Sequence, residues 1–90
     1  MDKKHYDQLF EAILSLETKA DCAAFFEDLC TIKELNDMHD RLAVAERLLA
    51  GETYENIVKE TKMSSATISR VNRCIQYGSG GYKRIIKRLK

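Results

Sequence analysis

The stretch that decides the fold lies at residues 53–73 and reads TYENIVKETKMSSATISRVNR. Its pattern predicts a short helix, a polar turn at 62–64 and a second helix that carries two arginines. Small residues occupy the expected outer face of that second helix: Ser65, Ala66, Ser69 and Asn72. The DNA major groove is about 12 Å wide, so such a face lets the helix backbone approach base edges. The sequence therefore predicts a helix-turn-helix over about 53–77, with an ordinary helical hairpin as the alternative.

An all-α fold of about six helices is predicted for the whole chain, because it has no proline and only four glycines. The expected helices span residues 3–17, 20–30, 32–50, 54–61, 65–77 and 82–90. Thr31 and Glu34 have the spacing of a capping box at the start of the longest helix. Gly51 is expected to end that helix, and Thr53 to cap the next one.

Apolar spacing indicates which side of each helix faces the core. The longest helix carries one continuous stripe of apolar residues three or four positions apart: Ile32, Leu35, Met38, Leu42, Ala45 and Leu49. The expected inward residues are Ile57 and Val58 of the helix at 54–61 and Ile68, Val71 and Ile75 of the helix at 65–77. Ile85, Ile86 and Leu89 form the apolar side of the helix at 82–90. The stripe makes the helix at 32–50 the expected spine of the fold.

Charge is distributed unevenly along the chain. Residues 1–50 contain eleven acidic and six basic side chains, whereas residues 51–90 contain nine basic and three acidic ones. No acidic residue follows Glu60. A polyanion-binding surface is therefore expected only on the helix-turn-helix and the C-terminal segment, unless the basic face of the last helix is merely solvated.

The length of ninety residues favours a single domain, 1–90, that buries little surface alone and gains from association with a second copy. Phe25 and Phe26 are adjacent, so both cannot face one narrow stripe. Burial of both rings against a partner subunit and partial exposure of one ring fit the sequence equally well.

Several classes of protein are disfavoured by the composition. Three cysteines without a C-x-x-C pair indicate reduced thiols in a cytoplasmic protein. His5 and His39 lie far apart, so neither a metal site nor any other cofactor is expected. Cys74 has no histidine near it in sequence, so an enzyme is not expected and no catalytic residue is assigned. No apolar run approaches the ~20 residues that cross a bilayer, so no contact with membranes is expected.

The run from Leu29 to Arg73 resembles the Trp repressor, with its capped spine helix, Gly51-Glu52 and the segment ATISR at 66–70. Together with the segment at 72–82, NRCIQYGSGGY, it is similar to the Trp-repressor-like proteins of the YerC/YecD type over nearly the whole chain. This resemblance implies an all-helical, intertwined homodimer whose N-terminal helices interlock.

The resemblance also implies where an effector pocket would lie. Residues at pocket positions are Thr31, Arg41, Thr67, Arg70, Val71 and Cys74. In the repressor two arginines sandwich the indole ring of tryptophan, and Arg41 and Arg70 stand at matching places. Val71 replaces a glycine and Cys74 a small polar residue, so tryptophan is not expected as corepressor and the effector is left unassigned. Arg41 and Arg70 are alternatively surface or phosphate-contacting arginines.

The predicted function is that of a sequence-specific DNA-binding transcriptional regulator, expected to be a repressor, that acts as a homodimer on double-stranded DNA. The residues assigned to DNA are Lys59, Lys62, Ser64, Ser65, Ala66, Thr67, Ser69, Arg70 and Arg73. A helical protein-interaction module on the same scaffold is the alternative, because a fold does not determine a function.

Overall fold

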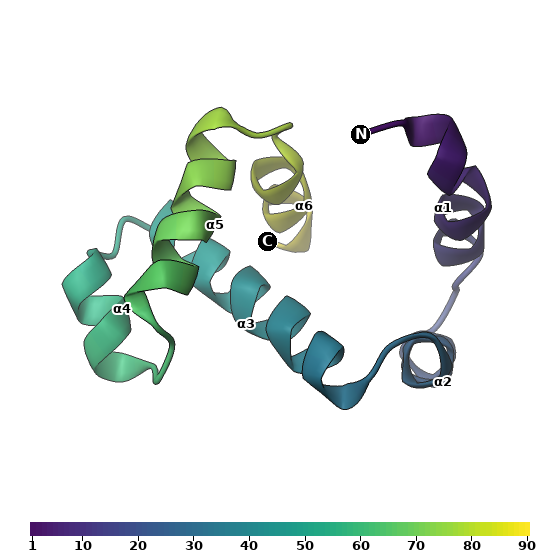
Figure 1. The fold of residues 1–90 in the computed structure, drawn as a ribbon, viewed down its shortest axis with the longest axis horizontal. Helices are drawn as coiled ribbons and strands as arrows, with labels where there is room; N and C mark the ends of the chain where they lie inside the picture. Colours follow the sequence, from purple (N-terminus) through teal and green to yellow (C-terminus); the bar gives the residue numbers. More distant parts are fainter. The chain divides into compact units, whose positions relative to one another are not determined.

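The computed structural model describes every residue from Met1 to Lys90 and contains helices without any strand (Figure 1). The all-α prediction is therefore confirmed. The elements in chain order are the 3-10 helix η1 (Lys3–Tyr6) and the α-helices α1 (Asp7–Leu14), α2 (Lys19–Leu29), α3 (Ile32–Leu49), α4 (Tyr54–Glu60), α5 (Ser65–Tyr77) and α6 (Gly81–Leu89). None of these helices combines the length and the apolar character that crossing a lipid bilayer requires.

Hydroxyl side chains define where most of these helices begin. Thr18, Thr53 and Ser64 are the N-caps of α2, α4 and α5, and each accepts a hydrogen bond from the backbone N–H three residues later at 3.0–3.2 Å. At α3 the predicted capping box is present. The Glu34 carboxylate accepts from the Thr31 N–H at 2.8 Å, and the Thr31 hydroxyl accepts from the Glu34 N–H at 3.1 Å. These bonds satisfy backbone donors that a helix leaves free at its start.

The end of α3 follows the predicted glycine termination. Gly51 has a φ of +93°, the left-handed region in which a side chain is strained. The Gly51 N–H donates to the Leu48 carbonyl at 3.0 Å, and the Glu52 N–H donates to the Arg47 carbonyl at 3.1 Å. This pair of bonds is a Schellman motif, and it turns the chain sharply from α3 toward α4.

The first helix differs from its prediction of one element over 3–17. Its first turn is the 3-10 helix η1, in which Asp2 accepts from the Lys4 N–H at 3.2 Å. The α-helix α1 ends at Leu14 because the Ser15 hydroxyl donates to the Ala12 carbonyl at 2.6 Å. A serine hydroxyl that donates to a nearby backbone carbonyl in this way competes with continuation of the helix.

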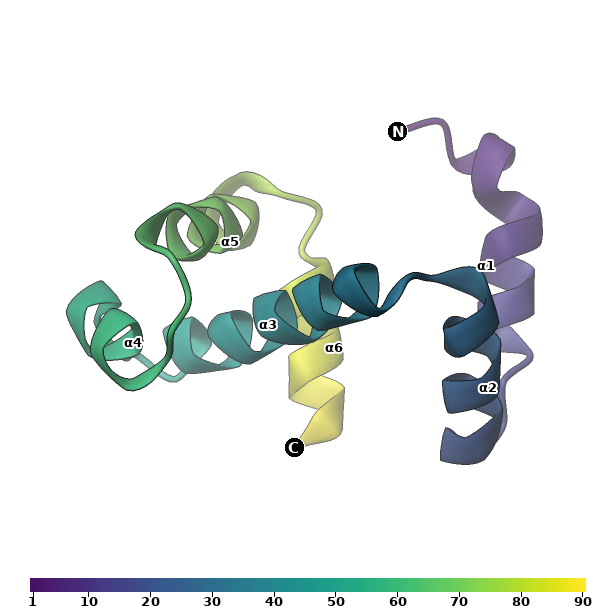
Figure 2. The same cartoon turned by 60° about the horizontal axis from the view of Figure 1, so that its bottom comes forward.

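The chain divides into two compact units, Met1–Leu35 and Asn36–Lys90. The first unit has no buried side chain. The core lies entirely in the second unit and draws on all four of its helices: Val44, Ala45, Ile57, Ile68, Val71, Ile75 and Ile86. Leu48, Leu49, Met63 and Tyr82 pack against that cluster. Within this unit α4 and α5 lie side by side in both views (Figure 1 and Figure 2).

The predicted apolar faces are only partly buried. Of two neighbouring residues on α4, Ile57 is fully buried whereas Val58 is 43% exposed; on α6, Ile86 is buried whereas Ile85 is 44% exposed. Successive residues of a helix point about 100° apart. A small core on one side of the helix therefore buries only one residue of each neighbouring pair. Leu89 of α6 is exposed as well. Three residues of the apolar stripe on α3 are also exposed, namely Ile32, Met38 and Leu42. The prediction of inward orientation was therefore wrong for Val58, and only Ile86 of the apolar side of α6 is buried.

Candidate nucleic-acid interface

The second helix of the helix-turn-helix, α5, has two distinct faces. Ile68, Val71 and Ile75 are buried and anchor the helix to the core of the second unit, as predicted. Other residues of α5 point to solvent: Ser65, Ala66, Ser69, Arg70 and Arg73 are all exposed. The exposed face combines small side chains at the start of the helix with two guanidinium groups further along it. Such a helix presents small and cationic side chains to solvent, while its apolar side chains hold it against the core.

The start of α5 is polar and free of acidic residues. The Ser64 hydroxyl accepts from the Thr67 N–H at 3.2 Å, and the Ser64 and Thr67 hydroxyls lie 3.0 Å apart. The N–H groups of Ser65 and Ala66 have no intrahelical acceptor, since they belong to the first turn. Such N–H groups at a positive helix end favour an anionic group in front of them.

Two further cations accompany this helix end. Lys59, in the last turn of α4, and Lys62, in the turn before α5, are both exposed. The turn is held from inside by Met63, which packs against the core, and by Thr61, whose hydroxyl donates to the Ile57 carbonyl at 2.6 Å. All nine residues that the sequence assigned to DNA thus belong to α4, α5 and the turn that joins them.

The residues assigned to an effector pocket have other surroundings. The Thr31 and Thr67 side chains take part in helix caps. Arg41 on α3 is half-buried, and Arg70 on α5 is exposed. Val71 is 2% exposed and belongs to the core. A buried valine leaves no opening at that position, so the assignment of these residues to a common effector site stays a prediction.

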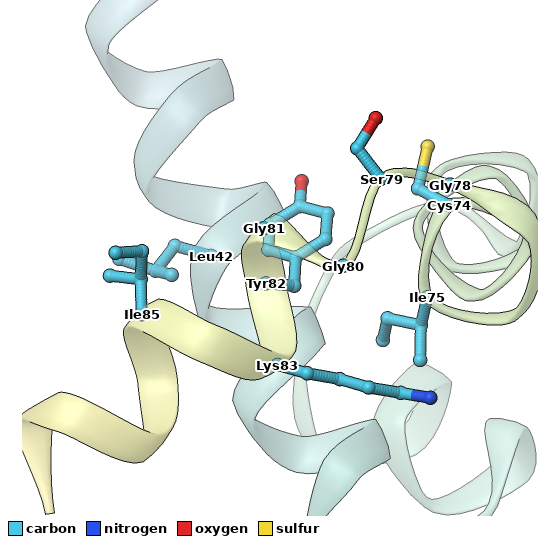
Figure 3. A pocket seen from close by; sticks show the side chains of 10 residues that line it. All are labelled: Leu42, Cys74, Ile75, Gly78, Ser79, Gly80, Gly81, Tyr82, Lys83 and Ile85. Carbon is cyan, nitrogen blue, oxygen red and sulfur yellow. The ribbon is translucent and has the colours of Figure 1, made fainter.

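Of those residues only Cys74 lines an apolar pocket of the second unit. The pocket measures about 550 Å³ and is lined by Leu42 of α3, by Cys74, Ile75 and Gly78 of the end of α5, and by the segment from Ser79 to Lys83 together with Ile85. Figure 3 shows Leu42 and Ile85 toward one end of the pocket and Cys74 and Ile75 toward the other, with the Lys83 side chain extending below Ile75 in this view. This apolar groove was not predicted. Its sequence signals are the glycines at 78–81 and the neighbouring Tyr82.

No group of His, Cys, Asp and Glu side chains in the structure is suited to hold a metal ion. The three cysteines are free thiols, with Cys22 and Cys74 exposed and Cys30 half-buried. The site therefore offers hydrogen-bonding and cationic groups on a rigid helix.

Comparison with known proteins gives a consistent family. The family model described as "Trp repressor protein" matches residues 4–90. The uncharacterized protein YerC of Bacillus subtilis (strain 168) is 49% identical over 87 residues, which are 97% of this chain and 84% of YerC. A TrpR-like protein from Eubacterium eligens ATCC 27750 is similar in structure with a TM-score of 0.89 and 46% identity, over 96% of this chain and 89% of that one. A putative Trp repressor from Staphylococcus aureus has a TM-score of 0.90 and 44% identity, over 96% of this chain and 86% of that one.

Proposed function

The chain belongs to the Trp repressor family, and from that premise we propose that it is a sequence-specific transcriptional regulator, most simply a repressor, that binds double-stranded DNA as a homodimer. It acts in the cytoplasm, without enzymatic activity and as one Trp-repressor-like domain over residues 1–90. The observation that carries the proposal is the divided surface of α5. Its buried side is fixed by Ile68, Val71 and Ile75, and its exposed side begins with small residues.

Base recognition is assigned to the exposed face of α5. Ser65, Ala66 and Ser69 keep the first turns slim, so that the helix enters the major groove with its N-terminal end toward base edges. Arg70 and Arg73 then reach guanine edges or the sugar-phosphate backbone, because an arginine fork suits either acceptor.

Backbone contact is assigned to the cations and amides around the turn. Lys59 and Lys62 are exposed just before and just after the C-terminal end of α4, and the free N–H groups of Ser65 and Ala66 donate to a phosphate oxygen. Phosphate contacts of this kind set the register of the protein on the duplex, while the groove contacts select the sequence.

The homodimer is supported by apolar surface that the single chain leaves uncovered. No side chain of Met1–Leu35 is buried, although this unit carries Tyr6, Phe10 and Leu14 on its surface. The second unit exposes an apolar groove that contains Leu42 and Ile85. A 90-residue chain with this much open apolar surface is stabilised by a second copy.

Selection of bound sequences from random duplex DNA is the direct test. We expect enrichment of a two-fold symmetric site whose half-sites lie about 34 Å apart, as for other helix-turn-helix dimers. Affinity for the selected site should fall steeply with salt, because phosphate contacts release counterions. If no sequence is enriched and binding to mixed DNA does not depend on salt, the proposal is wrong and a protein-interaction module is favoured.

A further inference from the structure

Four polar side chains at the junction of α3 and α4 form a closed ring, here called the junction ring: Arg47, Glu52, Asn56 and Glu60. Arg47 Nη2 donates to Glu60 Oε2 at 3.1 Å, and Arg47 Nε lies 3.5 Å from Glu52 Oε2. Asn56 Nδ2 donates to Glu52 Oε1 at 2.7 Å and to Glu60 Oε2 at 3.2 Å. Each carboxylate therefore contacts both the guanidinium group and the amide.

The junction ring joins α3 and α4, and α4 has little other contact with the core. Helix α4 has seven residues and a single buried side chain, Ile57, while Tyr54 and Val58 are largely exposed. One buried contact does not determine the rotation of a helix about its axis. Glu52, Asn56 and Glu60 follow one another at intervals of four, so they form one edge of α4 and its cap region, and Arg47 attaches that edge to α3.

The guanidinium group of Arg47 is partly withdrawn from water. Its Nη1 is buried and has no hydrogen-bond partner. A desolvated charge with an unpaired donor is unfavourable by itself, and the two carboxylates offset this cost only in a well-defined geometry. The arginine fork supplies that geometry, and a lysine ammonium does not reproduce it.

We propose that Arg47 and Glu60 are positioning residues for DNA recognition: through the junction ring they hold α4 at one rotation against α3 and thereby aim α5 at the groove. Helix α5 follows α4 after a short turn and packs against it. A change in the rotation of α4 therefore moves Lys59, Lys62 and the N-terminal end of α5, whereas Ile68, Val71 and Ile75 hold the rest of α5 against the core. This inference rests on the DNA-binding function proposed above.

Replacement of Glu60 tests the proposal, because a positioning role and a purely electrostatic role predict opposite changes in DNA affinity. It is exposed and lies between the two cations Lys59 and Lys62 in the chain. On charge alone, a carboxylate beside a DNA-binding surface repels phosphates, so its removal should raise affinity for every DNA sequence. Positioning predicts the opposite for the selected site, because the removal of Glu60 opens the junction ring.

The matched control is Glu55, the other carboxylate of α4, which has no hydrogen-bond or ion-pair partner. Affinities of Glu60→Ala and Glu55→Ala are measured for the selected site and for a scrambled duplex at one salt concentration. Folding of each variant is verified by circular dichroism. We expect Glu55→Ala to raise both affinities alike. We expect Glu60→Ala to reduce the ratio of selected to scrambled binding about tenfold, which corresponds to the loss of one charged hydrogen-bond network.

If Glu60→Ala and Glu55→Ala had the same ratio of selected to scrambled binding, the positioning proposal would be overturned, even though the wild type binds DNA. Absence of any preference in the wild type would instead refute the proposed function. Arg47→Lys is the second variant, to be used if Glu60→Ala does not fold. It keeps the positive charge at residue 47 but removes the guanidinium group that contacts both carboxylates. We expect its ratio to fall several-fold with an unchanged salt slope, since the number of phosphate contacts is the same. An unchanged ratio in folded Arg47→Lys would refute the proposal equally.

Discussion

At the scale of single residues, the side chain of Val71 belongs to the core of the second unit. The resemblance to the Trp repressor implies a glycine at this place in the repressor, where it leaves room for the ring of a ligand, whereas valine fills space with apolar contact. We therefore expect Val71 to strengthen the attachment of α5 and to leave no slot for tryptophan.

Free tryptophan is expected not to bind the wild type with useful affinity. Val71→Gly should open the slot and lower the free energy of unfolding by about 2–4 kcal/mol, because buried apolar contact is lost and glycine is a poor helix former. Calorimetry with tryptophan and thermal unfolding of both proteins measure the two effects. Clear binding by the wild type would show that this is a tryptophan sensor after all. Binding by the glycine variant alone would show that Arg41 and Arg70 retain the sandwich geometry.

Replacement of Arg73 by alanine should weaken DNA binding without unfolding the protein, since this side chain is exposed. If the guanidinium contacts a phosphate, the slope of log affinity against log salt should decrease by about one. Lys19→Ala, which removes the same charge from exposed α2, is the control and should leave the slope unchanged. An unchanged slope and affinity for the arginine variant would exclude Arg73 from the interface.

At the scale of helices, the boundaries were largely predictable because local chemistry sets them. The Thr31–Glu34 capping box and the Gly51 terminator act within a few residues of themselves, so the sequence alone contains their signal. Ser15 ends α1 by the same local chemistry, which the apolar spacing obscured.

Burial was less predictable, because it depends on what each helix packs against. Val44 is fully buried although it lies outside the predicted stripe, and Val58 is exposed although it is next to Ile57. The candidate site shows the same division. The exposure of the small residues on α5 followed from their spacing opposite Ile68 and Val71. The apolar groove and the junction ring bring together residues from different helices, so local patterns such as the glycines near Tyr82 do not by themselves show that they form.

The glycine that ends α3 should be sensitive to substitution. Gly51→Ala places a side chain at a φ of +93°, and we expect a loss of about 1 kcal/mol in unfolding free energy from backbone strain alone. Gly81→Ala is the control, because Gly81 has no positive φ and no atom near its Cβ position. The control should be neutral or slightly stabilising in chemical denaturation. Equal losses for both would contradict the role assigned to the left-handed turn.

At the scale of the whole molecule, the uneven burial between the two units is the main feature. The second unit holds the entire core, and the first unit has none of its own. Apolar residues of the first unit therefore require a covering surface, and the groove of the second unit requires an occupant. We expect the proposed homodimer to cover both surfaces, because each copy supplies the same two apolar regions.

Ile85→Glu should shift the protein toward monomers, because it places a charge in the apolar groove at a side chain that is 44% exposed. The cost of desolvating that charge should weaken association at least about tenfold. Arg84→Glu, a neighbouring change on the same helix outside the groove lining, is the control. Sedimentation across a concentration series measures both. A wild type that remains a stable, well-folded monomer at micromolar concentration would refute the dimer.

The distribution of core residues also has a consequence for synthesis on the ribosome. Residues 1–35 emerge first, yet they contain no core that would let them fold alone. The core runs from Val44 to Ile86, so it is complete only after Ile86 has left the exit tunnel. We therefore expect the N-terminal helices to stay exposed as apolar segments of each nascent chain, and the proposed dimer to form only between chains whose cores are complete.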